Sequence, residues 1–335
     1  MAASFFRVLW HSIFDPGFVG QLNRPKSESK GEWQRRGPRQ TPRMVRPPPT
    51  FESFYDQEFF VCDTEGKPVW CTECQIWRPD RTRHSKEFGR CIRRFDHYCP
   101  WVGGIVAENN FKFFIQFTTY AATFSLLSLI ITAYFLGSGE YVQKRTINLS
   151  ITAGFAVFFM LLAGGTGLSA ILLAGMNLTT LDNINQKTKV WQVAASTEMP
   201  KKSDGSDLTT VTAPKDHSRV FAILKSPAGC NPFDLGIMEN FRQVLGYHVW
   251  DWFLPIKHSP LCYSDAGNSD KIRPILPCME EMKEAAGLGS MTPQMRTTCD
   301  RYRKRQRRFP SLLAAAGAPL KTFKTNKALR AGGQP

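Results

Sequence analysis

The sequence predicts an all-α integral membrane protein that carries a small cytosolic cysteine-rich module of irregular or β-hairpin structure, and disordered basic termini. Three observations support this fold class. Two long apolar segments without charge lie in the middle of the 335 residues, and cysteines and histidines cluster just before the first of them. The first 100 and the last 150 residues are mostly polar, and the net charge is +15. The mean hydropathy of −0.27 is therefore an average over two apolar segments and the polar regions that flank them.

The N-terminal part is expected to lie at a membrane surface. Phe5 to Phe14 is apolar but too short to span a bilayer, and Asp15-Pro16-Gly17 ends it. Residues 1–21 thus form a predicted interfacial segment. Residues 22–68 are rich in Arg, Lys, Pro and Ser and are predicted to be a basic linker.

Two predicted transmembrane helices, residues 113–136 and 151–176, follow the cysteine-rich module at residues 69–112. Both lack charged residues, and about 20 apolar residues suffice to cross a bilayer. The stretch Ala163-Gly164-Gly165-x-Gly167 predicts close helix contact. The alternative is a pair of buried helices in a soluble protein, which two uncharged segments of this length disfavour.

Basic residues flank the two apolar segments on both sides, so the positive-inside rule places both ends of the chain in the cytosol. Residues 177–256 are expected to form a cytosolic region that packs at the membrane. Residues 257–335 are expected to be a largely disordered basic tail attracted to anionic lipid. A nucleic-acid patch is the alternative for the tail, but we expect no nucleic-acid partner.

Four side chains in the module have the spacing of a structural zinc site. Cys71-x2-Cys74, His84 and Cys91 form a Cys3His set within about 20 residues. No signal peptide precedes the nine cysteines, so ligands in a reducing compartment are expected rather than a disulfide framework. A redox Cys-x2-Cys pair is the alternative, but the βαβ context of thioredoxin-like proteins is missing.

Asp96, His97 and Cys99 offer three catalytic roles within one short turn. An imidazole can lower the pKa of a thiol, and an acid on its other nitrogen orients the ring. The alternative is that His97 and Cys99 are the metal ligands and His84 is not, and spacing alone leaves both open.

Residues 71–114 resemble the cysteine-rich domain of the membrane protein S-acyltransferases (palmitoyltransferases) named for an Asp-His-His-Cys motif. The likeness includes three flanking elements: Arg78-Pro79, Pro100-Trp101-Val102 and Asn109-Asn110-x2-Phe113. Three further segments resemble family motifs outside the module: Asp15-Pro16-Gly17, Thr179-Thr180-Leu181-Asp182 with Asp for Glu, and Asn231-Pro232-Phe233-Asp234-Leu235-Gly236 with Asn240-Phe241. Together the likeness covers roughly residues 12–256.

The chain departs from the family at four positions. Tyr98 replaces the second histidine of the tetrad, and Ser85, Phe88 and Ile105 replace cysteines. The family binds two zinc ions, and the replaced positions account for one complete site. We therefore expect one structural zinc, with Phe88, Tyr98 and Ile105 packed in place of the second. A tyrosine at this position also occurs in a fungal-type branch of the family whose members are active.

The resemblance implies transfer of a palmitoyl-type group from a fatty acyl-coenzyme A to Cys99 and then to a cysteine of a substrate protein. His97, oriented by Asp96, would move the proton, and two substrates at one thiol imply ping-pong kinetics. The lipid bilayer of an endomembrane or the plasma membrane would be the setting, with the module on the cytosolic side. The side chains of Arg93, Arg94 and Lys112 either contact the phosphates of coenzyme A or belong to a solvated, lipid-facing surface of the protein.

The family has two further transmembrane helices before Asp-Pro-Gly, so we expect an N-terminally truncated form. This raises an alternative function, a non-catalytic membrane-anchored zinc adaptor or an inactive form. Formation of an acyl-enzyme would distinguish the active transferase from these non-catalytic forms.

Overall fold

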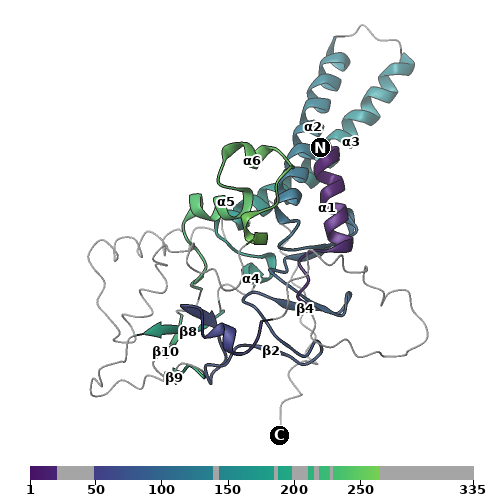
Figure 1. Ribbon diagram of the computed structural model, residues 1–335. Coiled ribbons are helices and arrows are strands. Elements are labelled where there is room, and N and C mark those ends of the chain that lie inside the picture. The colour runs from purple at the N-terminus through teal and green to yellow at the C-terminus, as the bar shows by residue number, and fades with distance from the viewer. Residues whose placement is uncertain are drawn as a thin grey trace, which may run out of the picture.

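Helices α2 and α3 form a long hairpin, and the rest of the described chain gathers at its base (Figure 1). The computed structural model describes residues 1–20, 49–138, 143–184, 188–197, 210–214, 219–226 and 229–263. The predictions for most of the basic linker and for the tail after residue 263 fall outside these residues.

The two predicted apolar segments are helices, each longer than expected. Helix α2 spans Phe111–Gly137 and α3 spans Gln143–Gly175. Both are long and apolar enough to cross a membrane. Large side chains point outward from them, and Phe124 and Leu161 are 61% and 65% exposed. A Cβ added at Gly167 would lie 3.0 Å from the Thr118 hydroxyl of α2, so the predicted close helix contact is confirmed.

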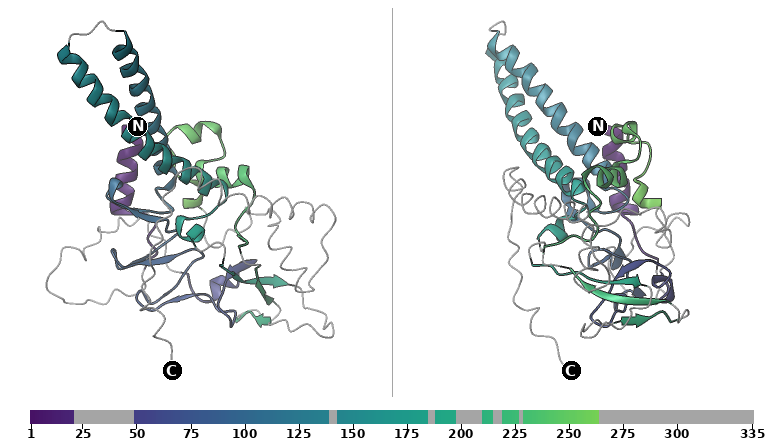
Figure 2. Two further views of the ribbon diagram at one scale, coloured as in Figure 1. Left: turned by 180° about the vertical axis from the view of Figure 1, so that it is seen from behind. Right: turned by 90° about the vertical axis from the view of Figure 1, so that its left-hand side faces the viewer.

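Helix α1, Ala2–Phe14, lies against the base of this hairpin both from behind and from the side (Figure 2). Phe5 contacts Phe117 of α2 with ring centroids 5.1 Å apart, and Val8 is fully buried. The opposite face of α1 keeps Phe6 exposed. The N-terminal apolar segment is thus a helix with one buried and one apolar outward face.

Below the helices, the module consists of three two-stranded antiparallel hairpins. Their strands are β2 (Trp70–Cys71) with β3 (Ile76–Trp77), β4 (Arg83–Ser85) with β5 (Arg90–Ile92), and β6 (His97–Cys99) with β7 (Gly104–Val106). The short helix η3, Pro100–Val102, makes the turn of the third hairpin, where Gly103 has a φ of 72°. A glycine suits this left-handed turn because it lacks Cβ.

A four-stranded antiparallel sheet corrects the predicted all-α fold class outside the module. Its order is β1-β8-β10-β9, with strands β1 (Phe59–Val61), β8 (Gln192–Thr197), β10 (Val220–Lys225) and β9 (Thr210–Thr212). Strand β1 and the short helix η2, Glu52–Phe54, lie within residues 22–68, so the prediction of a linker is wrong for these residues. The strands have only three to six residues, and β1 pairs with β8 across more than 100 positions, as Phe59 with Ala195 shows, so local sequence patterns did not predict this sheet.

The C-terminal described segment packs against the end of α3. It holds α4 (Thr180–Ile184), α5 (Ile237–Leu245), α6 (Val249–Phe253) and the short helix η4 (Pro260–Tyr263). The Asn240 amide donates to the carbonyl of Gly175 (2.8 Å), and the Asn231 amide donates to that of Met176 (2.9 Å). Two side chains thus satisfy the last carbonyls of α3, which otherwise lack partners.

Candidate functional site

The Asp15-Pro16-Gly17 segment ties α1 to the module. One Asp15 carboxylate oxygen accepts hydrogen bonds from the backbone N–H groups of Gly17 and Phe18, each 3.2 Å long. The backbone N–H of Val19 then donates to the carbonyl of Cys91 (2.9 Å). The chain therefore runs beside β5 immediately after leaving α1.

The four predicted metal ligands converge at one point. The ligand atoms of Cys71, Cys74, His84 and Cys91 all lie within 4.8 Å of one another. Cys71 and Cys74 come from the β2–β3 hairpin, while His84 and Cys91 face each other in the register of β4 and β5. Three thiols and an imidazole at this spacing fit a tetrahedral zinc ion, whose sulfur ligands lie about 3.8 Å apart.

His84, and not His97, is the histidine of this cluster. Its Nδ1 lies 3.2 Å from the sulfur of Cys74 and 3.7 Å from that of Cys71. Hydrogen bonding to Cys74 and then burial raise the pKa of the Cys91 thiol. Thiols packed so closely can all ionise only beside a cation. The cluster can therefore hold a metal ion.

Apolar side chains occupy the other half of the module. Ile105 is fully buried and packs with Phe18, Ile92 and Phe88, and the rings of Phe18 and Phe88 are 5.6 Å apart. The expected packing of Phe88 and Ile105 is therefore found. Tyr98 does not share it, because it lies on the outer face of β6 and is 51% exposed.

Asp96, His97 and Cys99 meet on the inner side of β6. His97 Nδ1 lies 2.6 Å from an Asp96 carboxylate oxygen. His97 and Cys99 are two residues apart in a strand, so they share a face, and their side chains are hydrogen-bonded. The structure therefore arranges acid, imidazole and thiol in series.

Thr180 of α4, which lies 84 positions after Asp96 in the sequence, holds the Asp96 carboxylate in place. Its backbone N–H donates to one Asp96 carboxylate oxygen (2.7 Å) and its hydroxyl donates to the other (2.9 Å). The resemblance of residues 179–182 to a family motif does not by itself predict this role of Thr180. Asp96 is 3% exposed, so its bonds to Thr180 and His97 are shielded from water.

The environment of His97 favours its protonated form. Burial lowers its pKa, but the hydrogen bonds and charges of Asp96 and Cys99 outweigh this and raise it to about 10. An imidazole with this preference can take the proton of the neighbouring thiol and hold it at neutral pH.

Cys99 faces the base of the helix hairpin. It is 6% exposed and belongs to a cluster of buried residues with Val8, Phe114 and Ala174, which come from α1, α2 and α3. His97 contacts the edge of the Phe114 ring, with centroids 5.5 Å apart. The thiol thus lies where the polar module meets the apolar helices.

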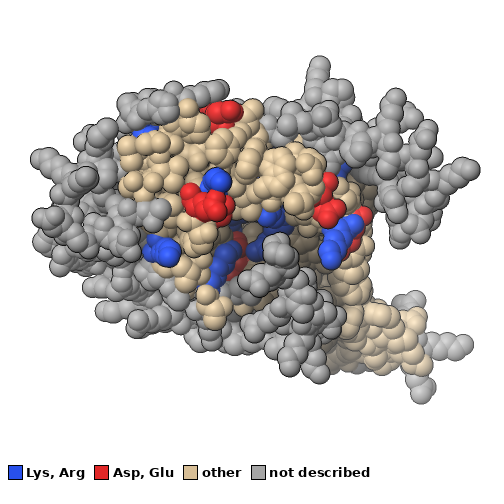
Figure 3. Space-filling view, turned by 90° about the horizontal axis from the view of Figure 1, so that it is seen from below, with Lys and Arg blue, Asp and Glu red and all other residues tan. Residues whose placement is uncertain are grey.

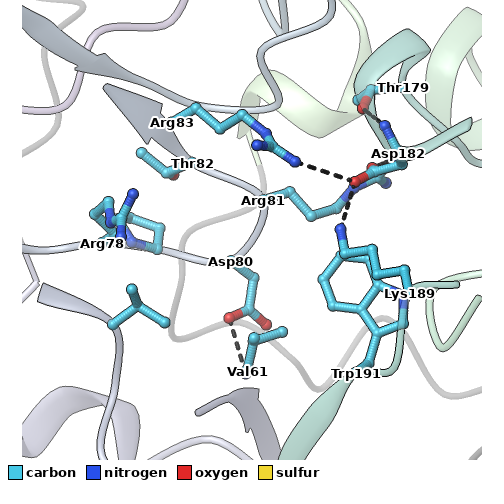
Figure 4. Close-up of a pocket in the computed structure, with 12 residues that line it drawn as sticks. Val61, Arg78, Asp80, Arg81, Thr82, Arg83, Thr179, Asp182, Lys189 and Trp191 are labelled. Carbon is cyan, nitrogen blue, oxygen red and sulfur yellow. Dashed lines mark hydrogen bonds and ion pairs between the residues drawn. The ribbon is translucent and has the colours of Figure 1, made fainter. Parts of the chain in front are cut away.

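A polar pocket of about 180 Å³ lies between the module and the four-stranded sheet. Figure 4 shows Arg83 and Lys189 pointing at Asp182, which also binds Arg81 at 3.0 Å. These cations hold the pKa of the Asp182 carboxyl below its ordinary range, although burial opposes them.

On the face opposite the long helices, basic side chains gather in a depression (Figure 3). Arg78 also lines the pocket, and no described acidic group pairs with it.

The three basic residues considered as phosphate contacts are buried instead. Arg93 pairs with Glu108 at 3.0 Å, while Arg94 and Lys112 are 7% and 1% exposed. They therefore form neither a solvated face nor an open phosphate site. Basic groups are found instead at the pocket lined by Arg78, where Arg81, Arg83 and Lys189 also lie.

Comparison with known proteins identifies the family. A family model described as DHHC palmitoyltransferase matches residues 64–187. Palmitoyltransferase pfa5 of Aspergillus fumigatus is 35% identical over 257 residues, which cover 71% of this chain and 58% of that protein. Palmitoyltransferase pfa5 of Emericella nidulans is 33% identical over 286 residues, covering 71% and 57%. Palmitoyltransferase PFA5 of Saccharomyces cerevisiae is 26% identical over 230 residues, covering 66% and 58%.

The chain thus spans less than two thirds of the length of these relatives. The matched residues include the converged Cys3His cluster, the Asp96–His97–Cys99 series and Thr180. This chain belongs to the DHHC palmitoyltransferase family.

Proposed function

We propose that the chain is a protein S-acyltransferase that uses Cys99 as its nucleophile. The observation that carries the proposal is the series Asp96–His97–Cys99, held by Thr180 and placed against the apolar base of the helices. The relatives are named palmitoyltransferases, which supports a palmitoyl-type acyl group.

The reaction has two steps at one thiol. His97 takes the Cys99 proton, and the thiolate attacks the thioester carbonyl of an acyl-coenzyme A, which releases coenzyme A as a thiol. The thiol of a substrate cysteine then attacks the Cys99 thioester, and its proton passes through His97 to Cys99. Asp96 holds the ring and stabilises its positive charge, because its carboxylate is itself fixed by two hydrogen bonds from Thr180.

A single zinc ion at Cys71, Cys74, His84 and Cys91 would serve structure and not chemistry. Four protein ligands complete a tetrahedral site and leave no position for water. The ion would link the β2–β3 and β4–β5 hairpins. β5 continues to Asp96 within four residues, so the link would position the catalytic strand.

The setting we propose is a multi-pass protein of the endomembrane system or plasma membrane with its module in the cytosol. The outward apolar side chains of α2 and α3 support lipid contact. The basic groups around the pocket beside Arg78 are suited to the phosphates of acyl-coenzyme A.

Labelling with alkyne-tagged palmitoyl-coenzyme A tests the proposal. We expect hydroxylamine-sensitive label on the Cys99 peptide of the purified full chain and none in Cys99→Ser. Cys62→Ser is the matched control, because Cys62 is buried away from this site and should leave the label intact. A folded, zinc-loaded wild type without label at Cys99 would reject the enzyme and favour the non-catalytic zinc adaptor.

A further inference from the structure

A second thiol, Cys262, lies beside the start of helix α2. It belongs to η4, is half-buried, and donates a hydrogen bond to the carbonyl of Glu108 (3.6 Å). Glu108 lies three residues before the first residue of α2. The thiol is therefore near the positive end of a 27-residue helix, where the dipole favours a thiolate.

A buried cation faces the same place. Lys112 is 1% exposed, and its Nζ has no hydrogen-bond partner among the described residues. The charge of Cys262 acts on it, as does that of Asp251, but the Asp251 carboxylate is paired with Lys257 at 3.3 Å. A buried ammonium without a hydrogen bond is costly, and a thiolate close by would reduce that cost.

Two imidazoles and an arginine lie beside Lys112. The ring of His258 contacts that of His11, with centroids 4.8 Å apart, and His258 is hydrogen-bonded to the backbone of Asn109. His11 Nδ1 is also buried without a partner among the described residues. Arg7 acts electrostatically on both His258 and Lys112. Burial lowers the pKa of both imidazoles, so Lys112 and Arg7 carry the positive charge beside the half-buried Cys262, and a cation close by favours the reactive thiolate.

Apolar surface for an acyl chain lies next to this thiol. Leu261 packs against the buried cluster that contains Cys99. Trp250, Phe253 and Ile256 are 74%, 57% and 64% exposed. Helix α6, which carries two of them, lies beside the base of the α2–α3 hairpin both from behind and from the side (Figure 2). A chain attached at Cys262 would therefore find apolar side chains that are continuous with the proposed membrane surface.

We propose that Cys262 is an acyl acceptor of this protein, modified by transfer from Cys99. This inference rests on the proposed function. The Cys262 sulfur attacks the carbonyl carbon of the Cys99 thioester and forms a new thioester, while the bond to the Cys99 sulfur breaks. Cys262 reacts as the thiolate, Cys99 leaves as the thiolate beside the protonated His97, and nothing is oxidised or reduced. The attached chain fixes the C-terminal segment to the lipid surface.

Cys62 is the matched comparison within the chain. It is 5% exposed, and burial, assisted by Asp63 and Asp80, raises its pKa to about 12. It lies in the apolar cluster of the four-stranded sheet, with no basic group among the causes that act on it. We expect no acyl group there.

The test maps the label of the full chain by peptide mass spectrometry after incubation with alkyne-tagged palmitoyl-coenzyme A. We expect label on the Cys99 and Cys262 peptides of the wild type. Cys262→Ser should lose only the second, Cys62→Ser should lose neither, and Cys99→Ser should lose both. Lys112→Met should slow labelling of Cys262 about tenfold relative to Cys99, the loss expected for one interaction with a charged group.

Two results would overturn this inference alone. One is a wild type labelled at Cys99 but not at Cys262. The other is equal labelling of Cys262 in Cys99→Ser, which would mean direct reaction with the coenzyme A thioester. Absence of label at Cys99 in a folded wild type would instead reject the proposed function.

Discussion

Hairpins β2–β3 and β4–β5 bring four metal-ligand side chains together, whereas hairpin β6–β7 rests on an apolar cluster around Ile105. In the first region, the buried thiols lie so close together that a bound cation would stabilise their ionised forms. In the second, Ile105, Phe88 and Phe18 fill the space without polar atoms. One small module is therefore built with two different sources of stability.

This contrast explains how the strand that carries the proposed nucleophile keeps its geometry without a second set of metal ligands beside it. Strand alternation places His97 and Cys99 on the inner face of β6 and Tyr98 on the outer face. Thr180 holds Asp96 from outside the module. The three catalytic candidates therefore keep their positions through side chains that do not require a second metal.

The largest expected effect is in the ligand half. Cys74→Ala removes one of four ligands, and structural zinc contributes about 10 kcal/mol or more to the folding of zinc-finger peptides. We expect loss of bound zinc and of Cys99 labelling, measured by metal analysis and by the acylation assay. Cys62→Ala should retain both. A Cys74→Ala protein with one tightly bound zinc would contradict the ligand set.

A smaller effect is expected in the apolar half. Ile105→Ala opens a cavity in a fully buried cluster and should cost about 2–5 kcal/mol, against about 0.5–1.5 kcal/mol for Ile105→Val. Chemical denaturation of the purified chain measures both. Zinc content should stay unchanged in each variant. Loss of zinc from Ile105→Ala would mean that the two halves are not independently stabilised.

The pair formed by Asp96 and His97 predicts a dependence of stability on pH. The pKa of His97 is raised from 6.5 to about 10, so its protonation stabilises the fold fully below pH 6.5 and stops doing so as the pH rises through 10. The melting temperature of the wild type should therefore fall more between pH 6.5 and 10 than that of His97→Gln. Parallel curves would show that Asp96 does not hold a charged imidazole.

The smallest effect is expected at Tyr98. Because this side chain is half exposed on the outer face of β6, Tyr98→His should change the unfolding free energy by less than about 0.5 kcal/mol. Metal analysis should find no additional zinc, since Ser85, Phe88 and Ile105 supply no thiols. A second bound zinc in this variant would show that the apolar half remains a metal site.

Local sequence patterns predicted the helices and the metal-ligand cluster, because both depend on residues that are close together in the chain. Uncharged length predicted both long helices, and ligand spacing predicted the Cys3His cluster, because a hairpin turn brings residues two or three apart together. Ligand spacing alone did not distinguish His84 from His97 as the metal-binding histidine. That distinction required the pairing of β4 with β5, which places His84 opposite Cys91.

Residue type and spacing were enough to predict which segments can cross a membrane and which side chains can bind a metal or attack a thioester. Tertiary structure alone decided which of them meet: β1 with β8, Arg81 with Asp182, Thr180 with Asp96, and Cys262 with Glu108. The physical reason is sequence separation. These contacts join residues 84 to 154 positions apart, and such pairs form only when the packing of the whole chain repays the entropy of closing long loops.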